Sequence, residues 1–76
     1  MSPLDHDPTA LRYALDKSGL TQTEFAKALK KSQSYVSEIL KGTRNANPGL
    51  LRDMARVLNC PIVVIEAKRV IEQASA

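Results

Sequence analysis

The chain has 76 residues, enough for one small domain and close to the lower limit for a core that supports itself. Hydrophobic residues make up 43% and charged residues 25% of the sequence, a balance that excludes a disordered chain and is typical of a globular protein. Aromatic residues account for only 4% and tryptophan is absent, so the core is built from aliphatic side chains, which favours packed helices.

The cysteine and histidine counts exclude several kinds of site. A single cysteine, Cys60, excludes an internal disulfide, and Cys60 with His6 supplies too few ligands for a zinc site. Because no catalytic constellation and no glycine-rich phosphate loop is visible, neither an enzyme nor a cofactor is expected. No apolar run is long enough to cross a bilayer, and the N-terminus lacks the regions of a signal peptide. We therefore expect a cytoplasmic protein with no metal and no membrane contact.

The net charge of +3 is unevenly distributed along the chain. Residues 1–26 carry an acidic excess, whereas residues 27–44 hold one acid, Glu38, against five basic residues: Lys27, Lys30, Lys31, Lys41 and Arg44. A basic middle segment is the charge footprint expected of phosphate contact, although a lysine-rich stretch is also typical of a solvated face. Charge alone therefore leaves both interpretations open.

The first two predicted helices are marked at both ends by capping signals. Asp7 followed by Pro8 begins the first helix, and Gly19 ends it in a left-handed cap. The second begins at the capping box Thr21-Gln22-Thr23-Glu24 and stops near Leu29. The residues expected to be buried are Leu11, Ala14 and Leu15 in the first helix and Phe25, Ala26 and Leu29 in the second.

Three further segments complete the predicted bundle. Ser32 caps a third helix that runs to about Lys41 and ends at Gly42. A fourth begins at Asn47-Pro48 and is broken at Cys60-Pro61, and the stretch from Pro61 to about Gln73 is either one helix or a short strand followed by a helix. The expected buried positions are Val36, Ile39 and Leu40 in the third helix and Leu51, Met54, Ala55 and Leu58 in the fourth.

The second and third segments have the pattern of a helix-turn-helix. Such a motif needs two short helices joined by a turn of about three residues, a small residue where the helices cross, and a polar outer face on the second helix. Ala26 is that small residue, and the outer face carries short hydroxyls, a glutamine and a tyrosine that can approach base edges or phosphates.

These residues resemble the lambda-repressor/Cro-like (XRE) helix-turn-helix family. The likeness lies in Leu20, Thr21-Gln22-x-Glu24-Phe25-Ala26, Leu29 and Ser32-x-x-x-Val36-Ser37-x-Ile39-x-x-Gly42, and it continues through Pro48, Leu51, Met54-Ala55 and Leu58 to Asn59-Cys60-Pro61. It covers roughly residues 8–66. The resemblance implies an all-α, compact bundle of about five short helices that binds double-stranded DNA.

Two positions depart from the family pattern, and both are in the turn. Lys30 stands where the family usually has glycine, and a left-handed conformation there would cost on the order of 1 kcal/mol. Lys31 stands where the family generally has an apolar residue, so either its stem covers the core or the turn differs slightly in shape.

The resemblance places the helix from Ser32 in the major groove and so assigns DNA contacts. The residues expected to read bases are Gln33, Ser34, Ser37 and Glu38. The residues expected to contact phosphate are Thr21, Gln22, Ser32, Tyr35, Lys41, Thr43, Arg44 and Asn45.

Structural interpretations of some of these residues stay open. Ser32 and Gln22 could serve only as helix-start residues, and Tyr35 could be half-buried packing. Glu38 could repel phosphate or neutralise Lys41. His6 is expected to lie in a flexible N-terminal tail over residues 1–7 without a role, and Cys60 to be a small core residue.

Three functions are consistent with the sequence. The first is a sequence-specific transcriptional regulator, a repressor, that binds as a homodimer through a surface containing Val63, Val64, Val70 and Ile71 within or next to a C-terminal helical extension over residues 67–76. The second is an antitoxin that holds a toxin with the segment from about Glu66 to Ala76. The third is a helical protein-interaction module without DNA contact, favoured by the acidic Glu38 on the outer face.

Overall fold

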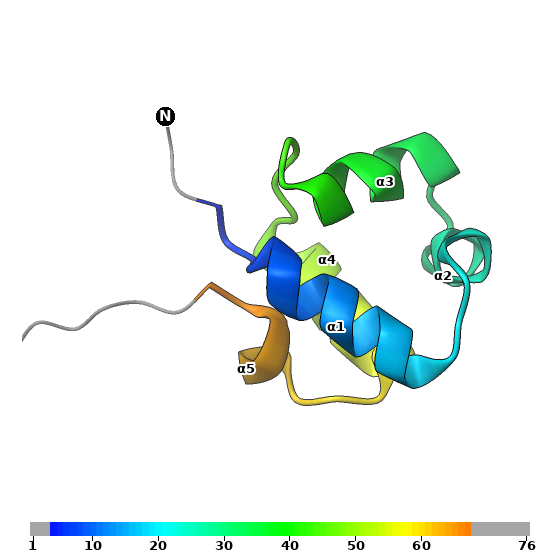
Figure 1. Cartoon of the computed structure of the whole chain (residues 1–76). Helices are drawn as coiled ribbons and strands as arrows, with labels where there is room; N and C mark the ends of the chain where they lie inside the picture. The colour runs from blue at the N-terminus through cyan, green and yellow to red at the C-terminus, as the bar shows by residue number, and fades with distance from the viewer. Residues whose placement is uncertain (1–3, 68–76) are drawn as a thin grey trace, which may run out of the picture.

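Five helices follow one another along residues 4–67, the part of the chain that the computed structural model describes (Figure 1). They are α1 (Pro8–Ser18), α2 (Gln22–Leu29), α3 (Gln33–Lys41), α4 (Pro48–Leu58) and α5 (Ile62–Ile65). No strand occurs among the described residues, and none of their helices is long and apolar enough to cross a membrane. The all-α class and the helix-turn-helix between α2 and α3 are confirmed.

The helix starts are fixed by side chains that accept hydrogen bonds from free backbone N–H groups. Asp7 accepts from the amides of Thr9 and Ala10 at 3.0 and 3.1 Å and so begins α1. At α2 the predicted capping box is complete: Thr21 Oγ1 accepts from the Glu24 amide at 3.0 Å, and the Glu24 carboxylate accepts from the Thr21 amide at 2.9 Å.

The ends of α1 to α4 all use a left-handed residue. Gly19 and Gly42 adopt φ values of 81° and 87°, as predicted from their glycines. Lys30 and Asn59 adopt φ values of 60° and 55° without being glycine. Asparagine tolerates this conformation well, whereas at Lys30 the Cβ is strained. The α2–α3 turn therefore keeps the geometry usual for glycine, and it costs the chain stability.

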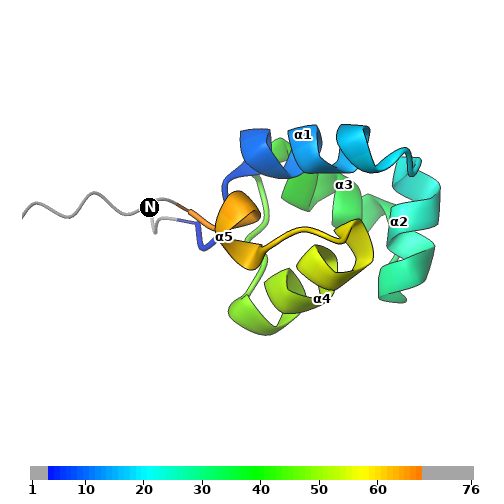
Figure 2. The ribbon, with the colours of Figure 1, turned by 90° about the horizontal axis from the view of Figure 1, so that it is seen from below.

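The core lies where the helices converge. Figure 2 shows α1 and α4 on opposite sides, with α5 near one end and α2 at the other. α1 packs against α3, α4 and α5, while α2 packs against α3 and α4. Every residue that the sequence predicted to be buried in α1 to α4 is buried, and Leu50, Ala46 and Ile65 join them. Aliphatic residues and the single phenylalanine thus hold the bundle together, as the composition indicated.

The last helix is shorter than the sequence suggested. α5 has four residues, and Glu66 is already extended, with φ −80° and ψ 158°. All four residues of α5 are β-branched and no side chain caps its start, so little favours extending the helix. Most of the predicted C-terminal extension lies outside the described residues.

Residues 4–7 do not form the flexible tail that was expected. His6 is 1% exposed and pairs with Glu66 in an antiparallel bridge. Asp7 N donates to Ile65 O and Ala67 N donates to Asp5 O, each at 2.9 Å. No pattern within this four-residue segment indicates that it pairs with residues 65–67, at the other end of the described chain.

Lys30→Gly should stabilise the protein, because glycine adopts a positive φ without the Cβ clash. We expect the free energy of unfolding in urea to rise by about 0.5–1 kcal/mol. Lys27→Gly is the matched control: it lies inside α2 and is exposed, so it should lower stability by roughly 1 kcal/mol. If both substitutions are equally destabilising, the left-handed assignment is wrong.

Candidate nucleic-acid interface

The turn between α2 and α3 is short and is closed by backbone hydrogen bonds. Lys30 N donates to Lys27 O at 3.1 Å and Lys31 N to Ala26 O at 3.0 Å, which closes a Schellman motif at the end of α2. Ser32 then caps α3, its Oγ accepting from Tyr35 N at 3.1 Å. Ala26 is 3% exposed in α2, which packs against α3, so its small side chain suits close packing of the two helices.

α3 is divided into a buried and a polar side. Val36, Ile39 and Leu40 are buried against the rest of the bundle. Among the predicted base-reading residues, Gln33 and Ser34 are exposed in the first turn, while Ser37 and Glu38 are half-buried further along. The helix is therefore held from behind by apolar contacts while its first turn stays open to solvent.

The predicted phosphate-contacting residues near the helix starts fall into two groups. The hydroxyls of Thr21 and Ser32 are engaged as cap acceptors, which leaves each O–H free to donate. Gln22 is the first residue of α2, and its side chain lines an open groove that also contacts Ser37 and Lys41 of α3. The groove brings these three predicted residues, from two helices, to one place.

The side chains of Thr43 and Asn45, after α3, are already engaged in hydrogen bonds within the protein. Thr43 Oγ1 donates to Glu38 O at 3.2 Å. Asn45 is bound at both ends of its amide: Oδ1 accepts from Asp5 N at 2.7 Å and Nδ2 donates to the Asp5 carboxylate at 2.8 Å. Asn45 therefore connects the loop after α3 to the N-terminal segment. The second N–H of Nδ2 is the side-chain donor of Asn45 that stays available to a phosphate.

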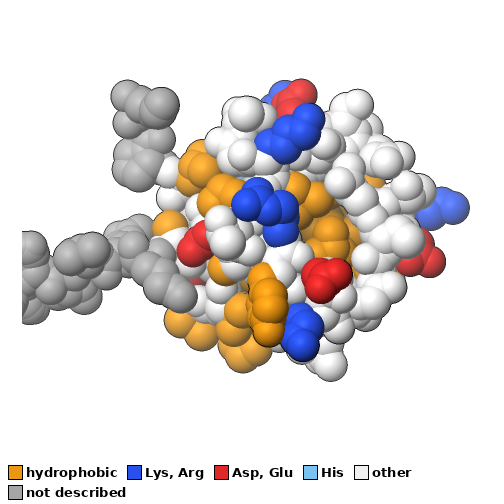
Figure 3. Space-filling model, in the orientation of Figure 1, with side chains coloured by type: hydrophobic (Ala, Val, Ile, Leu, Met, Phe, Trp, Pro, Cys, Tyr) orange, Lys and Arg blue, Asp and Glu red, His pale blue; other side chains and the backbone are white. Residues whose placement is uncertain are grey.

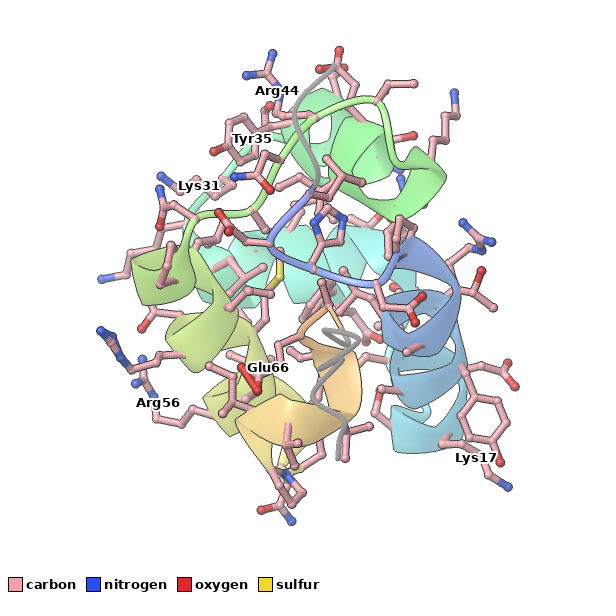
Figure 4. The ribbon with its side chains drawn as sticks, turned by 90° about the vertical axis from the view of Figure 1, so that its left-hand side faces the viewer. Lys17, Lys31, Tyr35, Arg44, Arg56 and Glu66 are labelled. Atoms are coloured by element: carbon pink, nitrogen blue, oxygen red, sulfur yellow. The ribbon has the colours of Figure 1, made fainter. Side chains whose placement is uncertain are left out.

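A polar cluster forms around the ring of Tyr35, which is half-buried and packs against the core. Lys31 Nζ lies 5.4 Å and the Arg44 guanidinium carbon 4.8 Å from the ring centroid, distances typical of cation–π contacts. Arg44 Nε also donates to the Glu38 carboxylate at 2.7 Å. In Figure 4, Tyr35 lies between Arg44 and Lys31.

The last turn of α3 is held by side chains that the sequence analysis missed. His6 Nε2 donates to Ile39 O at 2.8 Å, and Arg12 Nη1 donates to Leu40 O. His6 Nδ1 accepts from Ala46 N at 3.4 Å, so the ring connects α3 to the loop that follows it. Both residues lie more than 25 positions from their partners, and neither belongs to a motif that would have signalled this role.

Most of the positive charge in residues 27–44 has no acidic partner in the part of the chain that the structure describes. Within residues 4–67 the ion pairs are Arg44–Glu38 and Arg56–Asp53, so Lys27, Lys30, Lys31 and Lys41 have no acidic partner there. The described residues contain no cluster of three or more potential metal ligands. Burial raises the pKa of the half-buried Cys60 thiol, so this cysteine is the less reactive thiol form at neutral pH.

A separate apolar patch lies on α5 and the neighbouring part of α1. Tyr13, Val63 and Val64 are 62%, 61% and 37% exposed, and hydrophobic side chains gather on this part of the surface in Figure 3. Two of the four residues predicted to form a dimer surface, Val63 and Val64, are therefore accessible. Val70 and Ile71 lie outside the described residues, as does most of the segment considered for a toxin.

Comparison with known protein families gives one match. A family model described as helix-turn-helix matches residues 11–65, which extend from α1 to the end of α5 and include the whole α2–turn–α3 unit. No curated protein matches the chain.

His6→Ala should destabilise the protein, because it removes one of the two hydrogen bonds to Ile39 O, leaves Ala46 N without its partner and opens a cavity. We expect the free energy of unfolding in urea to fall by about 1–3 kcal/mol. Thr23→Ala, at an exposed position of α2, is the control and should change stability by less than about 0.5 kcal/mol. A loss at His6 no larger than in this control would mean that the histidine does not hold α3.

Proposed function

We propose a function from one premise: the chain belongs to the lambda-repressor/Cro-like helix-turn-helix family of DNA-binding regulators. In this proposal it represses transcription by binding a specific sequence of double-stranded DNA. In this proposal α3 enters the major groove, and the chain acts as a homodimer on a two-fold related site. The family membership supplies DNA as the partner, and the finer statements rest on the arguments below.

The observation that carries the proposal is the division of α3 into a buried and a polar side. Its first turn presents Gln33 and Ser34 to solvent while Val36 and Ile39 anchor it from behind. A helix fits the major groove only if its outer face is narrow and polar, and if its position is fixed by packing on the inner face. Uncompensated lysines beside it add the long-range attraction that phosphate binding requires.

Base reading is assigned to the outer face of α3. The Gln33 amide can pair bidentately with adenine, and the hydroxyls of Ser34 and Ser37 can donate or accept at a base edge. The carboxylate of Glu38 can accept from a cytosine amino group, although it would do so while already accepting from Arg44 at 2.7 Å.

Phosphate contact is assigned to the ends of the motif. The residues are Thr21 and Gln22 at the start of α2, Ser32, Tyr35 and Lys41 on or beside α3, and Thr43, Arg44 and Asn45 in the loop after it. The free O–H of each capping hydroxyl and the exposed cations are donors suited to an anion.

Homodimerisation through the α5 side is supported by the exposed apolar patch. Val63 and Val64 would be covered in a dimer, and two copies on adjacent half-sites supply the contact area that one small module lacks. A protein-interaction module without DNA contact loses its main support, because the acid on the outer face, Glu38, is paired with Arg44.

Selection of bound duplexes from a random pool, followed by sequencing, tests the proposed function. The wild-type chain should enrich an inverted repeat whose half-site centres lie about 34–36 Å apart. Gln33→Ala should lose discrimination at one base pair by roughly 1–3 kcal/mol, whereas Arg44→Ala should weaken all sequences about equally. Arg56→Ala on α4 is the control and should retain the wild-type preference.

Two outcomes of this selection contradict the proposal. If the wild-type chain gives neither enrichment nor a gel shift at low salt, where phosphate attraction is strongest, the chain does not bind DNA. If Arg44→Ala relaxes a single base while Gln33→Ala weakens all sequences, the reading face has been assigned wrongly.

Light scattering tests the homodimer. The wild-type chain should have the mass of a dimer, at least on an inverted repeat, and Val63→Lys with Val64→Lys should give a monomer because two charges would be buried at the interface. Ala28→Lys adds a charge at an exposed position of α2 and should leave the free protein's mass unchanged. A wild-type monomer both free and on DNA contradicts dimerisation.

A further inference from the structure

The ring of Tyr35 brings together two cations from separate segments. Lys31 comes from the α2–α3 turn and Arg44 from the loop after α3, yet both positive groups lie within 6 Å of the same ring, at 5.4 and 4.8 Å. The half-buried ring packs against the core, so its position is fixed by the fold. The structure therefore assembles this pair of cations before any ligand is present (Figure 4).

Glu38 fixes the orientation of the Arg44 guanidinium. Its carboxylate accepts from Arg44 Nε at 2.7 Å, and its backbone carbonyl accepts from Arg44 N at 3.3 Å. Within residues 4–67 the terminal nitrogens of Arg44 have no hydrogen-bond partner, so the outer edge of the fork stays available. That edge carries the parallel N–H groups that bind a phosphate in bidentate geometry.

The charges of this cluster favour an anion as its ligand. Two cations held against one ring repel each other, and Glu38 compensates only one of them. The Arg44 and Glu38 side chains are 47% and 46% exposed, so a ligand can reach them from solvent. A phosphodiester offers two acceptor oxygens that fit the parallel N–H groups on the free edge of the guanidinium.

We propose that Arg44 binds one backbone phosphate of DNA through the free edge of its guanidinium, and that Glu38 is a positioning residue that holds Arg44 in this site. This role replaces the base-reading role considered for Glu38 above. The inference rests on the proposed function and deepens it. Lys31, on the other side of Tyr35 in Figure 4, adds positive charge beside the site, which an apolar residue could not do.

Two neutral substitutions at Glu38 test the positioning role. Glu38→Gln and Glu38→Ala remove the same negative charge, but only glutamine keeps an oxygen that accepts from Arg44 Nε. Binding is measured by fluorescence anisotropy on a labelled duplex of random sequence, at several salt concentrations. A random duplex averages out base reading, so the difference between the two variants reports on the phosphate site alone.

The positioning role predicts a specific order of affinities. Glu38→Gln should bind as tightly as the wild type or more tightly, and Glu38→Ala should bind about two- to fivefold more weakly than Glu38→Gln. In an Arg44→Ala background the two variants should bind equally, because the group that Glu38 positions is gone. Arg44→Ala itself should reduce the slope of log K against log salt by about 0.9.

The Asp53–Arg56 pair of α4 is the matched control, since it is also an exposed bridge, at 2.8 Å. Asp53→Asn and Asp53→Ala repeat the same comparison away from the cluster, and they should differ by less than about twofold.

The possible failures are distinguishable. If Glu38→Ala equals Glu38→Gln while the wild type binds DNA, the positioning role is overturned and the proposed function stands. If Glu38→Ala instead relaxes the preference at one base pair in the selection experiment, Glu38 is a base reader. If the wild type does not bind the duplex at low salt, the proposed function fails and the site fails with it.

Discussion

The carbonyl groups in the last turn of α3 need hydrogen-bond donors, and the way in which they are satisfied shapes much of the molecule. A helix leaves its final carbonyls without partners inside the helix. Here the donors come from three places. Residues 42–44 after the helix donate to Glu38 O and Ile39 O, His6 of the N-terminal segment also donates to Ile39 O, and Arg12 of α1 donates to Leu40 O. A helix seated only by Val36, Ile39 and Leu40 could slide or rotate, whereas directional bonds to its last turn limit both movements.

The same end of α3 connects the support of the helix to its outer face. Glu38 is the acceptor for the loop amides through its carbonyl, and its carboxylate binds Arg44. Glu38 thus orients the guanidinium and helps to hold the loop, which is also held through Asn45 and Ala46. Exposed ion pairs contribute little to the free energy of unfolding, so the main effect of this pair is to orient the Arg44 side chain. The left-handed Lys30 also costs stability without changing the geometry of the turn. In return, the adjacent Lys30 and Lys31 place two positive charges in the turn.

Local signals in the sequence were enough to predict the helices and the motif. Caps such as Asp7, the Thr21–Glu24 box and Gly42 act within a few residues, and the apolar spacing of α3 depends only on the helical period. Arg12, His6 and Asp5 could not be placed in this way, because their partners in and after α3 lie 28 to 40 positions away and those at residues 65–67 lie further still. Most of these partners are backbone atoms without a sequence signature. The pairing of Glu38 with Arg44, not Lys41, depends on the loop turning back at Gly42, which helical periodicity does not describe.

The closure of residues 5–7 on residues 65–67 has a consequence for the order in which the protein folds during synthesis. The caps and periodic faces of α1, α2 and α3 are local, but helices of 8 to 11 residues are only marginally stable until the bundle packs around them. Asn45 can bind Asp5 once the loop after α3 has been made, whereas Asp7 N and Asp5 O gain their partners only when Ile65 and Ala67 arrive. Until then the segment that carries His6, a donor to the last turn of α3, is held on one side only. We therefore expect α3 to be firmly seated only after residues 65–67 have been synthesised.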